Sequence, residues 1–243
     1  MKEKLKRDAF MFRQKNGLNP NEPIYFKSLL LKLNVQSLFK PLKTQNISGI
    51  AVKARNDLKF MMINTSLSRG RQHFTIAHEL YHLYIQPNFT NMSCNTSNFD
   101  RKDLIEYHAD IFASNLILPE IGLYELIPDS ELKKDTISLR TILSLEQYYS
   151  CSRTALLYKL KEMNIITSPL FEMYNKDKIK SAINYGYDIN LYQPDNITTF
   201  IGDYGSISKQ LFDDEKISET HYLSLLADIG IDVTNQGGEN VDD

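Results

Sequence analysis

The first half of the chain alternates between hydrophobic patterns of two different periods. Residues 21–35 (NEPIYFKSLLLKLNV) carry apolar side chains at helical spacing after a proline near their start, which predicts a helix. Residues 47–53 and 58–64 are short strand-like runs on either side of the sequence ARND, which predicts a β-hairpin. The helical period returns over residues 69–85, and this helix is expected to end before Pro87, because a residue that precedes proline disfavours the helical conformation.

The second half carries mostly helical patterns. Residues 86–103 are polar and predict a loop, whereas residues 104–119 (LIEYHADIFASNLILP) predict an amphipathic helix that ends at a proline. Residues 136–166 predict two helices joined by a turn at residues 150–152. Farther on, residues 218–230 predict a helix that is capped by a serine and stopped by a glycine. Helices that flank a short run of strands predict an α+β fold.

Length and composition limit the class of protein. The chain has 243 residues, of which 42% are hydrophobic and 24% charged, as in a soluble globular protein of one or two domains. No run approaches the roughly 18 apolar residues of a membrane span, and the start MKEKLKRDAF lacks the apolar segment of a secretory signal. We therefore expect a cytoplasmic protein. Cys94 and Cys151 lie too far apart to indicate a CxxC site or a disulfide framework, and we expect no internal repeat.

Charge is distributed unevenly, although the net charge is only −2. Residues 1–60 hold 13 Lys and Arg against 4 Asp and Glu, whereas residues 195–243 hold 2 against 11. This asymmetry is compatible with a basic face that meets nucleic acid and an acidic tail that meets a basic partner, or with two solvated faces. Composition alone leaves both interpretations open.

The stretch HFTIAHELYH, residues 73–82, contains three of the five histidines. His78 and His82 stand four residues apart on a predicted helix, so both rings can reach one ion. Zinc favours neutral histidine nitrogen and carboxylate oxygen, and a catalytic site leaves one of its four positions for water. Glu79 lies at the rim of the same helix face, where it is the candidate general base of an HExxH motif. The alternative is a pair of surface histidines with no metal.

A catalytic zinc ion needs a third protein ligand. Glu106, on the next predicted helix, is the favoured candidate. Asp110 follows it by four residues and is placed to accept the ring N–H of a zinc-binding histidine. His108 is the alternative third ligand, and His108, His73 and Tyr81 are also candidates for contacts with a substrate or a transition state. We expect one zinc ion per chain.

The segments RGRQHFTIAHELYHLYI and IEYHADIFASNLILP together resemble the paired motifs R-x-R-F-T-x-A-H-E-x-x-H and E-x-x-A-N-x-F-A-x-x-L-L-x-P of the ImmA/IrrE family of metallopeptidases. The residues that match are Arg71, Phe74, Thr75, Ala77, His78, Glu79 and His82 in the first motif and Glu106, Ala109, Phe112, Ala113, Leu116 and Pro119 in the second. The chain departs from the family at His73, where arginine is usual, at Tyr81, where glycine is usual, and at Asp110, where asparagine is common. The resemblance spans residues 20–165.

The resemblance implies a thermolysin-like zincin domain in residues 1–125, with helices packed on a small, mostly antiparallel sheet. It also implies zinc bound by His78, His82 and Glu106, with Glu79 as the general base. A helical, helix-turn-helix-like module is expected in residues 126–169. Residues 170–243 are expected to form a mixed, acidic extension that ends in disorder and influences the choice of partner.

A zinc-dependent endopeptidase is the implied function, and its implied substrate is a helix-turn-helix repressor of a mobile element or stress response. The alternative is a regulatory binding module that keeps the metal site but cleaves nothing. In the helix-turn-helix-like module, Arg153 and Lys159 are candidate phosphate contacts. Leu156, Leu157 and Leu160 at helical spacing predict a packed core there instead. We therefore expect neither direct DNA binding nor a membrane partner.

Overall fold

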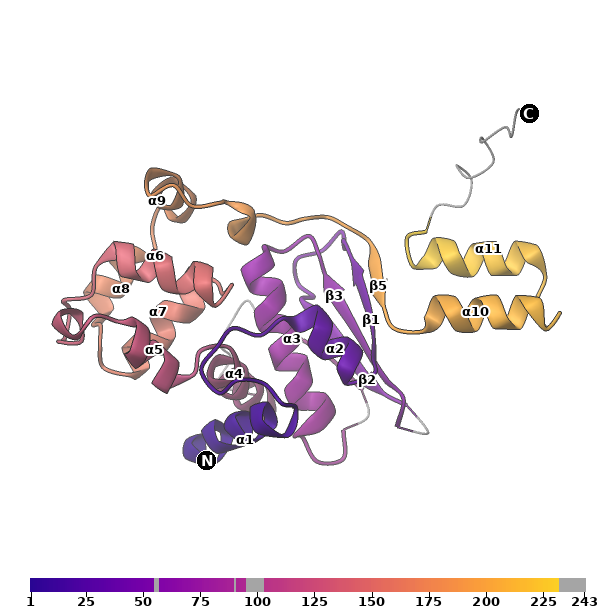
Figure 1. Ribbon diagram of the computed structural model, residues 1–243, viewed down its shortest axis with the longest axis horizontal. Coiled ribbons are helices and arrows are strands. Elements are labelled where there is room, and N and C mark those ends of the chain that lie inside the picture. The colour runs from indigo at the N-terminus through magenta and orange to yellow at the C-terminus, as the bar shows by residue number, and fades with distance from the viewer. Residues whose placement is uncertain (55–56, 90, 95–102, 232–243) are drawn as a thin grey trace.

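A five-stranded mixed sheet packs beside helices in the computed structural model, which describes residues 1–54, 57–89, 91–94 and 103–231 (Figure 1). The strands are β1 (Val35–Lys40), β2 (Gly49–Lys53), β3 (Lys59–Asn64), β4 (Asn91–Cys94) and β5 (Thr199–Ile201). Their order is β4-β2-β3-β1-β5, and every neighbouring pair is antiparallel except β1 with β3. The α+β class and the hairpin of β2 and β3 agree with the sequence pattern, which does not predict β1, β4 or β5.

Strand β1 begins where the sequence pattern predicts the end of a helix. Helix α2 covers only Phe26–Lys32, and Asn34, with a φ of 51°, turns the chain into the strand. Asparagine tolerates this left-handed conformation better than most residues. Val35 and Phe39 of the strand are buried. The apolar run is continuous across both elements, so its spacing does not separate a helix from a buried strand.

Helix α3 (Arg69–Tyr84) packs on β2 and β3, and α2 packs on β1. Helix α4 (Leu104–Ile117) packs on α3, and α1 (Lys2–Lys15) packs on α4. The sequence pattern predicts α3 and α4 but not α1. Fully buried Ala77, Ala109 and Ala113 allow α3 and α4 to approach closely. The buried side chain of Arg13 on α1 donates to the Leu116 carbonyl at 2.9 Å. It thereby satisfies an acceptor in the last turn of α4 that has no partner within the helix.

The next part of the chain is helical and lies at the left of Figure 1. It contains α5 (Glu120–Leu126), the 3-10 helix η2 (Asp129–Glu131), α6 (Leu139–Tyr148), α7 (Arg153–Glu162), α8 (Ser168–Tyr174) and α9 (Lys178–Asn184). Helices α6 and α7 are the predicted pair, joined by a turn in which Ser150 has a φ of 49°. Ser152 caps α7 by accepting a hydrogen bond from the Ala155 amide at 3.2 Å. A helix-turn-helix function for this pair stays a prediction.

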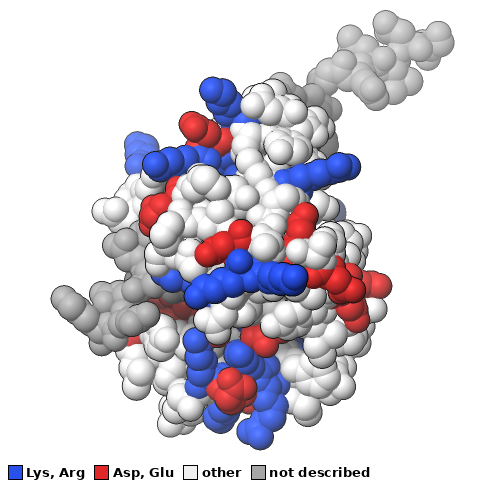
Figure 2. All heavy atoms as spheres, turned by 90° about the vertical axis from the view of Figure 1, so that its left-hand side faces the viewer, with Lys and Arg blue, Asp and Glu red and all other residues white. Residues whose placement is uncertain are grey.

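Arg153 and Lys159, the candidate phosphate contacts, lie inside the protein and are not available to a nucleic acid. Arg153 is 1% exposed and donates to both carboxylate oxygens of Glu146, at 2.5 and 2.7 Å. Lys159 is fully buried and donates to Asn115 at 2.6 Å and to Glu120 at 2.9 Å. On the face of the molecule formed by this helical part, cationic and anionic side chains are interspersed (Figure 2). Such a face lacks the continuous basic surface that nucleic acid favours.

The chain then returns to the sheet. The 3-10 helix η3 (Asn190–Tyr192) leads to Pro194, which forms an isolated β-bridge with Ser68 just before α3, and on to β5 at the sheet edge. Helices α10 (Tyr204–Asp213) and α11 (Glu219–Asp228) follow and stand clear of the other helices (Figure 1). Helix α11 is the predicted one, capped by Ser218 and followed by Gly230, whose φ is 82°. Part of the predicted extension therefore belongs to the sheet, and the domain boundary at residue 170 stays a prediction.

Two further expectations concern membranes and thiols. Within the described ranges, no helix is long and apolar enough to cross a membrane. Cys151 is buried, and burial raises the pKa of its thiol well above the usual value, so the thiolate needed for reaction is scarce. The side chain of Cys94 lies outside the described residues.

Replacing Arg153 by alanine should lower the free energy of unfolding by about 3–5 kcal/mol, because Glu146 would stay buried without its cation. Burial already raises the pKa of the Glu146 carboxyl, and hydrogen bonds from Arg153 oppose that rise. Urea denaturation of both proteins measures the difference. Arg140→Ala, on the exposed face of α6, is the control and should change stability by less than about 0.5 kcal/mol. Equal stability of the two variants would contradict a structural role for the buried pair.

Candidate metal centre

Three side chains from α3 and α4 converge in the interior between these helices. His78 and His82, one helical turn apart on α3, are 1% and 0% exposed. The carboxylate of Glu106, in the first turn of α4, lies 3.1 Å from His78 Nε2 and 3.4 Å from His82 Nε2. The three potential ligand atoms all lie within 4.8 Å of one another. The described structure thus brings together the three side chains that the sequence nominates as metal ligands.

The far side of each imidazole is held by a hydrogen bond. His78 Nδ1 donates to Asp110 Oδ1 at 2.9 Å, and His82 Nδ1 donates to Gln86 Oε1 at 2.5 Å. Each bond directs the Nε2 atom of its ring toward Glu106. Such contacts fix the tautomer and the ring orientation of metal-binding histidines. The spacing predicts Asp110 in this position but not Gln86, which lies two residues beyond the end of α3.

Charge interactions among His78, His82, Glu106 and Asp110 stabilise their arrangement in the absence of an ion. Burial lowers the pKa of His78, but hydrogen bonds to Asp110 and Glu106 outweigh burial and raise it to about 10. Burial raises the pKa of Glu106, but close contacts with the rings of His78 and His82 lower it to about 2. A histidinium and a carboxylate therefore hold each other in place, and a divalent cation would replace the proton of His78 as the positive charge.

The donor set fits zinc. Two imidazole nitrogens and one carboxylate oxygen are ligands that zinc takes at roughly 2.0–2.2 Å, which in a tetrahedral arrangement places neighbouring ligand atoms about 3.3–3.6 Å apart. The measured separations of 3.1 and 3.4 Å are close to this range. Among the described residues, His82 Nε2 and Glu106 Oε1 are buried and have no hydrogen-bond partner. Buried polar atoms rarely lack partners, so these two favour a cation between them.

Glu79 lies beside the three converging side chains and is completely buried. It follows His78 on α3, and its carboxylate reaches the start of β2. A Cβ atom added to Gly49 would lie 2.8 Å from Glu79 Oε1 and 2.6 Å from Thr75 Cγ2. Such distances are too short for a real side chain, so the strand approaches α3 this closely because position 49 is glycine. The packing of β2 therefore limits where the Glu79 carboxylate can lie.

His73, Tyr81 and His108, the other candidate residues, are not among the three converging side chains. His73 is five residues before His78, about 140° around the helix; its Nδ1 donates to the Ser150 carbonyl at 2.8 Å, and it lines a cavity of about 730 Å³. Tyr81 is 6% exposed and belongs to the hydrophobic core, with its ring centroid 5.8 Å from that of Phe112. Its ring centroid also lies 5.5 Å from that of His82, so Tyr81 packs against a candidate metal ligand. His108 is half-buried and is not among the converging side chains.

Comparison with known proteins supports a peptidase function for the chain. The family model of peptidase family M78, described as the IrrE N-terminal-like domain, matches residues 31–161, which is more than half of the chain. The chain belongs to this family. Membership confirms the resemblance carried by the HExxH helix and the Glu106 helix, and it supports a peptidase, and hence a hydrolase, function for this M78 chain. A search of curated proteins found no match.

Replacing Glu106 by glutamine should weaken zinc binding by about 10-fold or more, because a neutral amide is a poorer zinc ligand than a carboxylate. The matched control is His108→Ala, on the same helix but about 200° from Glu106, and it should leave affinity unchanged. Competition with a chromophoric chelator measures both affinities. If the two variants lose zinc equally, Glu106 is not the third ligand.

Replacing Gly49 by alanine should slow proteolysis while leaving zinc affinity unchanged, because the atoms nearest to the new methyl group belong to Thr75, Glu79 and Met62, none of which is a ligand. Overpacking of this kind also costs about 1–3 kcal/mol of stability. The control is Gly205→Ala on α10, where a Cβ would meet only Ile229 Cδ1 at an ordinary 3.7 Å. Hydrolysis of labelled casein and zinc titration compare the variants. Unchanged hydrolysis in the Gly49 variant would show that β2 does not position Glu79.

Proposed function

We propose that the chain is a zinc-dependent endopeptidase of the cytoplasm that holds one zinc ion through His78, His82 and Glu106. The observation that carries this proposal is the convergence of the three side chains with Glu79 next to them. Metal ligands alone serve binding or structure, whereas a carboxylate beside them that is not needed as a ligand serves proton transfer. For this reason we favour an enzyme over a regulatory module that only keeps the metal site.

Peptide hydrolysis at this site needs a nucleophile and a proton carrier. Zinc, when bound, polarises the scissile carbonyl and lowers the pKa of a coordinated water toward about 7. Glu79 accepts the proton of the attacking water and passes it to the departing amine, so one carboxylate acts first as base and then as acid. Asp110 and Gln86 hold the two imidazoles in the orientation that this requires. The complete burial of Glu79 keeps its carboxylate away from bulk water and so favours proton transfer within the site.

The proposed substrate is a protein that binds in extended form along an edge of the sheet, where its backbone can add hydrogen bonds to a strand. We propose a helix-turn-helix repressor as that protein. This identity rests on the resemblance to the family and on the acidic balance of residues 195–243, since DNA-binding proteins are basic. A direct DNA-binding role for α6 and α7 receives no support, because Arg153 and Lys159 are buried.

Replacing Glu79 by glutamine should abolish proteolysis, with a loss of at least about 100-fold, while zinc content stays at one ion per chain. The substitution removes the base and leaves all three ligands in place. Glu172→Gln, on an exposed position of α8, is the matched control and should cleave at the wild-type rate. Zinc content by atomic absorption and hydrolysis of labelled casein or of a purified repressor give the two readouts. A Glu79→Gln protein that holds zinc and cleaves normally would contradict the mechanism.

A further inference from the structure

Two segments late in the chain end in the same short pattern. Residues 186–190 read GYDIN and residues 230–234 read GIDVT, so each has glycine, any residue, aspartate, a β-branched aliphatic residue and then asparagine or threonine. Each pattern follows a pair of short helices, α8 with α9 and α10 with α11. Both glycines adopt the left-handed conformation, with φ of 77° at Gly186 and 82° at Gly230. This correspondence revises the expectation that the chain holds no internal repeat.

The first unit resembles a known class of helical repeat. Ankyrin-type repeats consist of a turn and two helices and open with a T-P-L-H motif. Helix α8 opens with Ser168, Pro169, Leu170 and Phe171, which keeps the central proline and leucine. The second unit lacks this opening, and β5 occupies the chain just before it. We therefore interpret the two helix pairs as divergent ankyrin-type units separated by a strand of the peptidase sheet.

The first unit has a helical neighbour. Helix α8 packs against α7, where the buried ring of Phe171 lies 4.8 Å from the ring of Tyr158. Thr154 of α7 hydrogen-bonds to Asn175 after α8 at 2.9 Å, and Arg153 donates to Ser181 of α9 at 3.1 Å. Units of this class bury their apolar faces by stacking on neighbours, and this unit stacks on α7.

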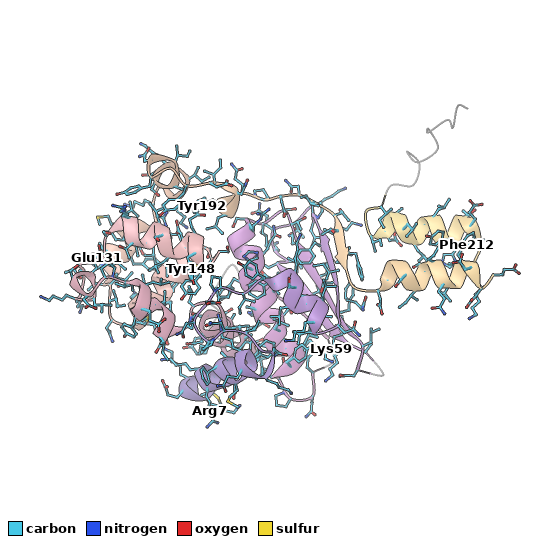
Figure 3. All side chains as sticks on the ribbon, in the orientation of Figure 1. Arg7, Lys59, Glu131, Tyr148, Tyr192 and Phe212 are labelled. Carbon is cyan, nitrogen blue, oxygen red and sulfur yellow. The ribbon has the colours of Figure 1, made fainter. Side chains whose placement is uncertain are left out.

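The second unit has no such neighbour among the described residues. Its two helices, α10 and α11, pack against each other and stand apart from the other helices (Figure 1). Phe212 lies on this pair (Figure 3), with its ring stacked 5.1 Å from that of Tyr222. Ile207 is 48% exposed and Leu223 is 36% exposed. Isolated helices of about ten residues are marginal in water, and the exposed Ile207 and Leu223 are apolar side chains that a further helix can cover.

Charge decides between the possible occupants. Residues 203–230 contain six Asp and Glu against two Lys, and both lysines already pair with acids, Lys209 with Asp213 and Lys216 with Asp214. A second copy of the same acidic pair would bring like charges together, which costs free energy. A basic helix would gain from both its apolar face and its charge.

We propose that α10 and α11 form a docking arm for a positively charged amphipathic helix of a partner protein. The partner stacks on the arm as a neighbouring repeat would, with Ile207 and Leu223 in the apolar contact and the acids of the arm around it. The inference does not depend on the metal centre. The arm follows β5 along the chain, and the Asp203 amide at its start donates to Gln36 Oε1 of β1 at 3.2 Å, which ties the arm to the sheet.

The test uses the full chain and a defined probe, a fluorescein-labelled peptide of about 18 residues with leucine and lysine at amphipathic helical spacing. Fluorescence anisotropy measures its binding, and a peptide with glutamate in place of lysine is the charge control. The lysine peptide should bind at least about tenfold more tightly than the glutamate peptide, and the difference should shrink in high salt. Hydrogen exchange of residues 204–229 should slow when the lysine peptide is present.

The double variant Ile207→Ser and Leu223→Ser should bind the lysine peptide at least about tenfold more weakly, with no change in net charge. The matched control is Ile179→Ser with Ile183→Ser, which removes exposed aliphatic side chains from α9 of the first unit and should bind normally. The proposal is overturned if the two double variants bind equally, or if exchange in residues 204–229 does not change. Self-association of the wild-type chain that is lost only in the Ile207 and Leu223 variant would place a second copy on the arm and also overturn it.

Discussion

The close packing of α3 against α4 is the constraint on which the candidate metal centre depends. Ala77 on one helix and Ala109 and Ala113 on the other are fully buried, and larger residues there would separate the helices. A wider separation would move Glu106 away from the two histidines. Arg13 holds the far end of α4 to α1 through the Leu116 carbonyl. The position of the Glu106 carboxylate therefore depends on the packing of all three helices.

Two buried charged groups of the helical part are matched by polar groups on other elements. Glu146 meets Arg153 and the hydroxyl of Tyr192 on η3, a residue labelled in Figure 3. Lys159 meets Asn115 and Glu120. Buried pairs contribute little net stability, but the loss of one partner is costly. They therefore specify which helices meet, and so tie the helical part to α4 and to η3.

Sequence reasoning succeeds here where the determinants are local. The helical spacing of His78 and His82, and of Glu106 and Asp110, follows from the period of the helix and needs no tertiary information. Sequence reasoning fails where contacts with distant segments of the chain determine the structure. The three-residue strand β5 has almost no pattern of its own and forms because β1 offers a free edge. In the sequence, Arg153 and Lys159 resemble surface cations, because their buried partners are known only from the structure. His73, on another face of α3, is held by the carbonyl of Ser150, which lies 77 positions later in the chain.

Pairing of β5 with β1 has a consequence for biosynthesis. Residues 37–39 find their partners only at residues 199–201, so a chain emerging from the ribosome exposes one edge of β1 through most of translation. An unpaired edge strand is a template for aggregation, and contacts of such long sequence separation form slowly. Peptidase helices can assemble earlier, since α3 and α4 are close in sequence. Closure of the sheet is then among the last steps of folding, and nascent chains are most dependent on chaperones until residue 201 has left the exit tunnel.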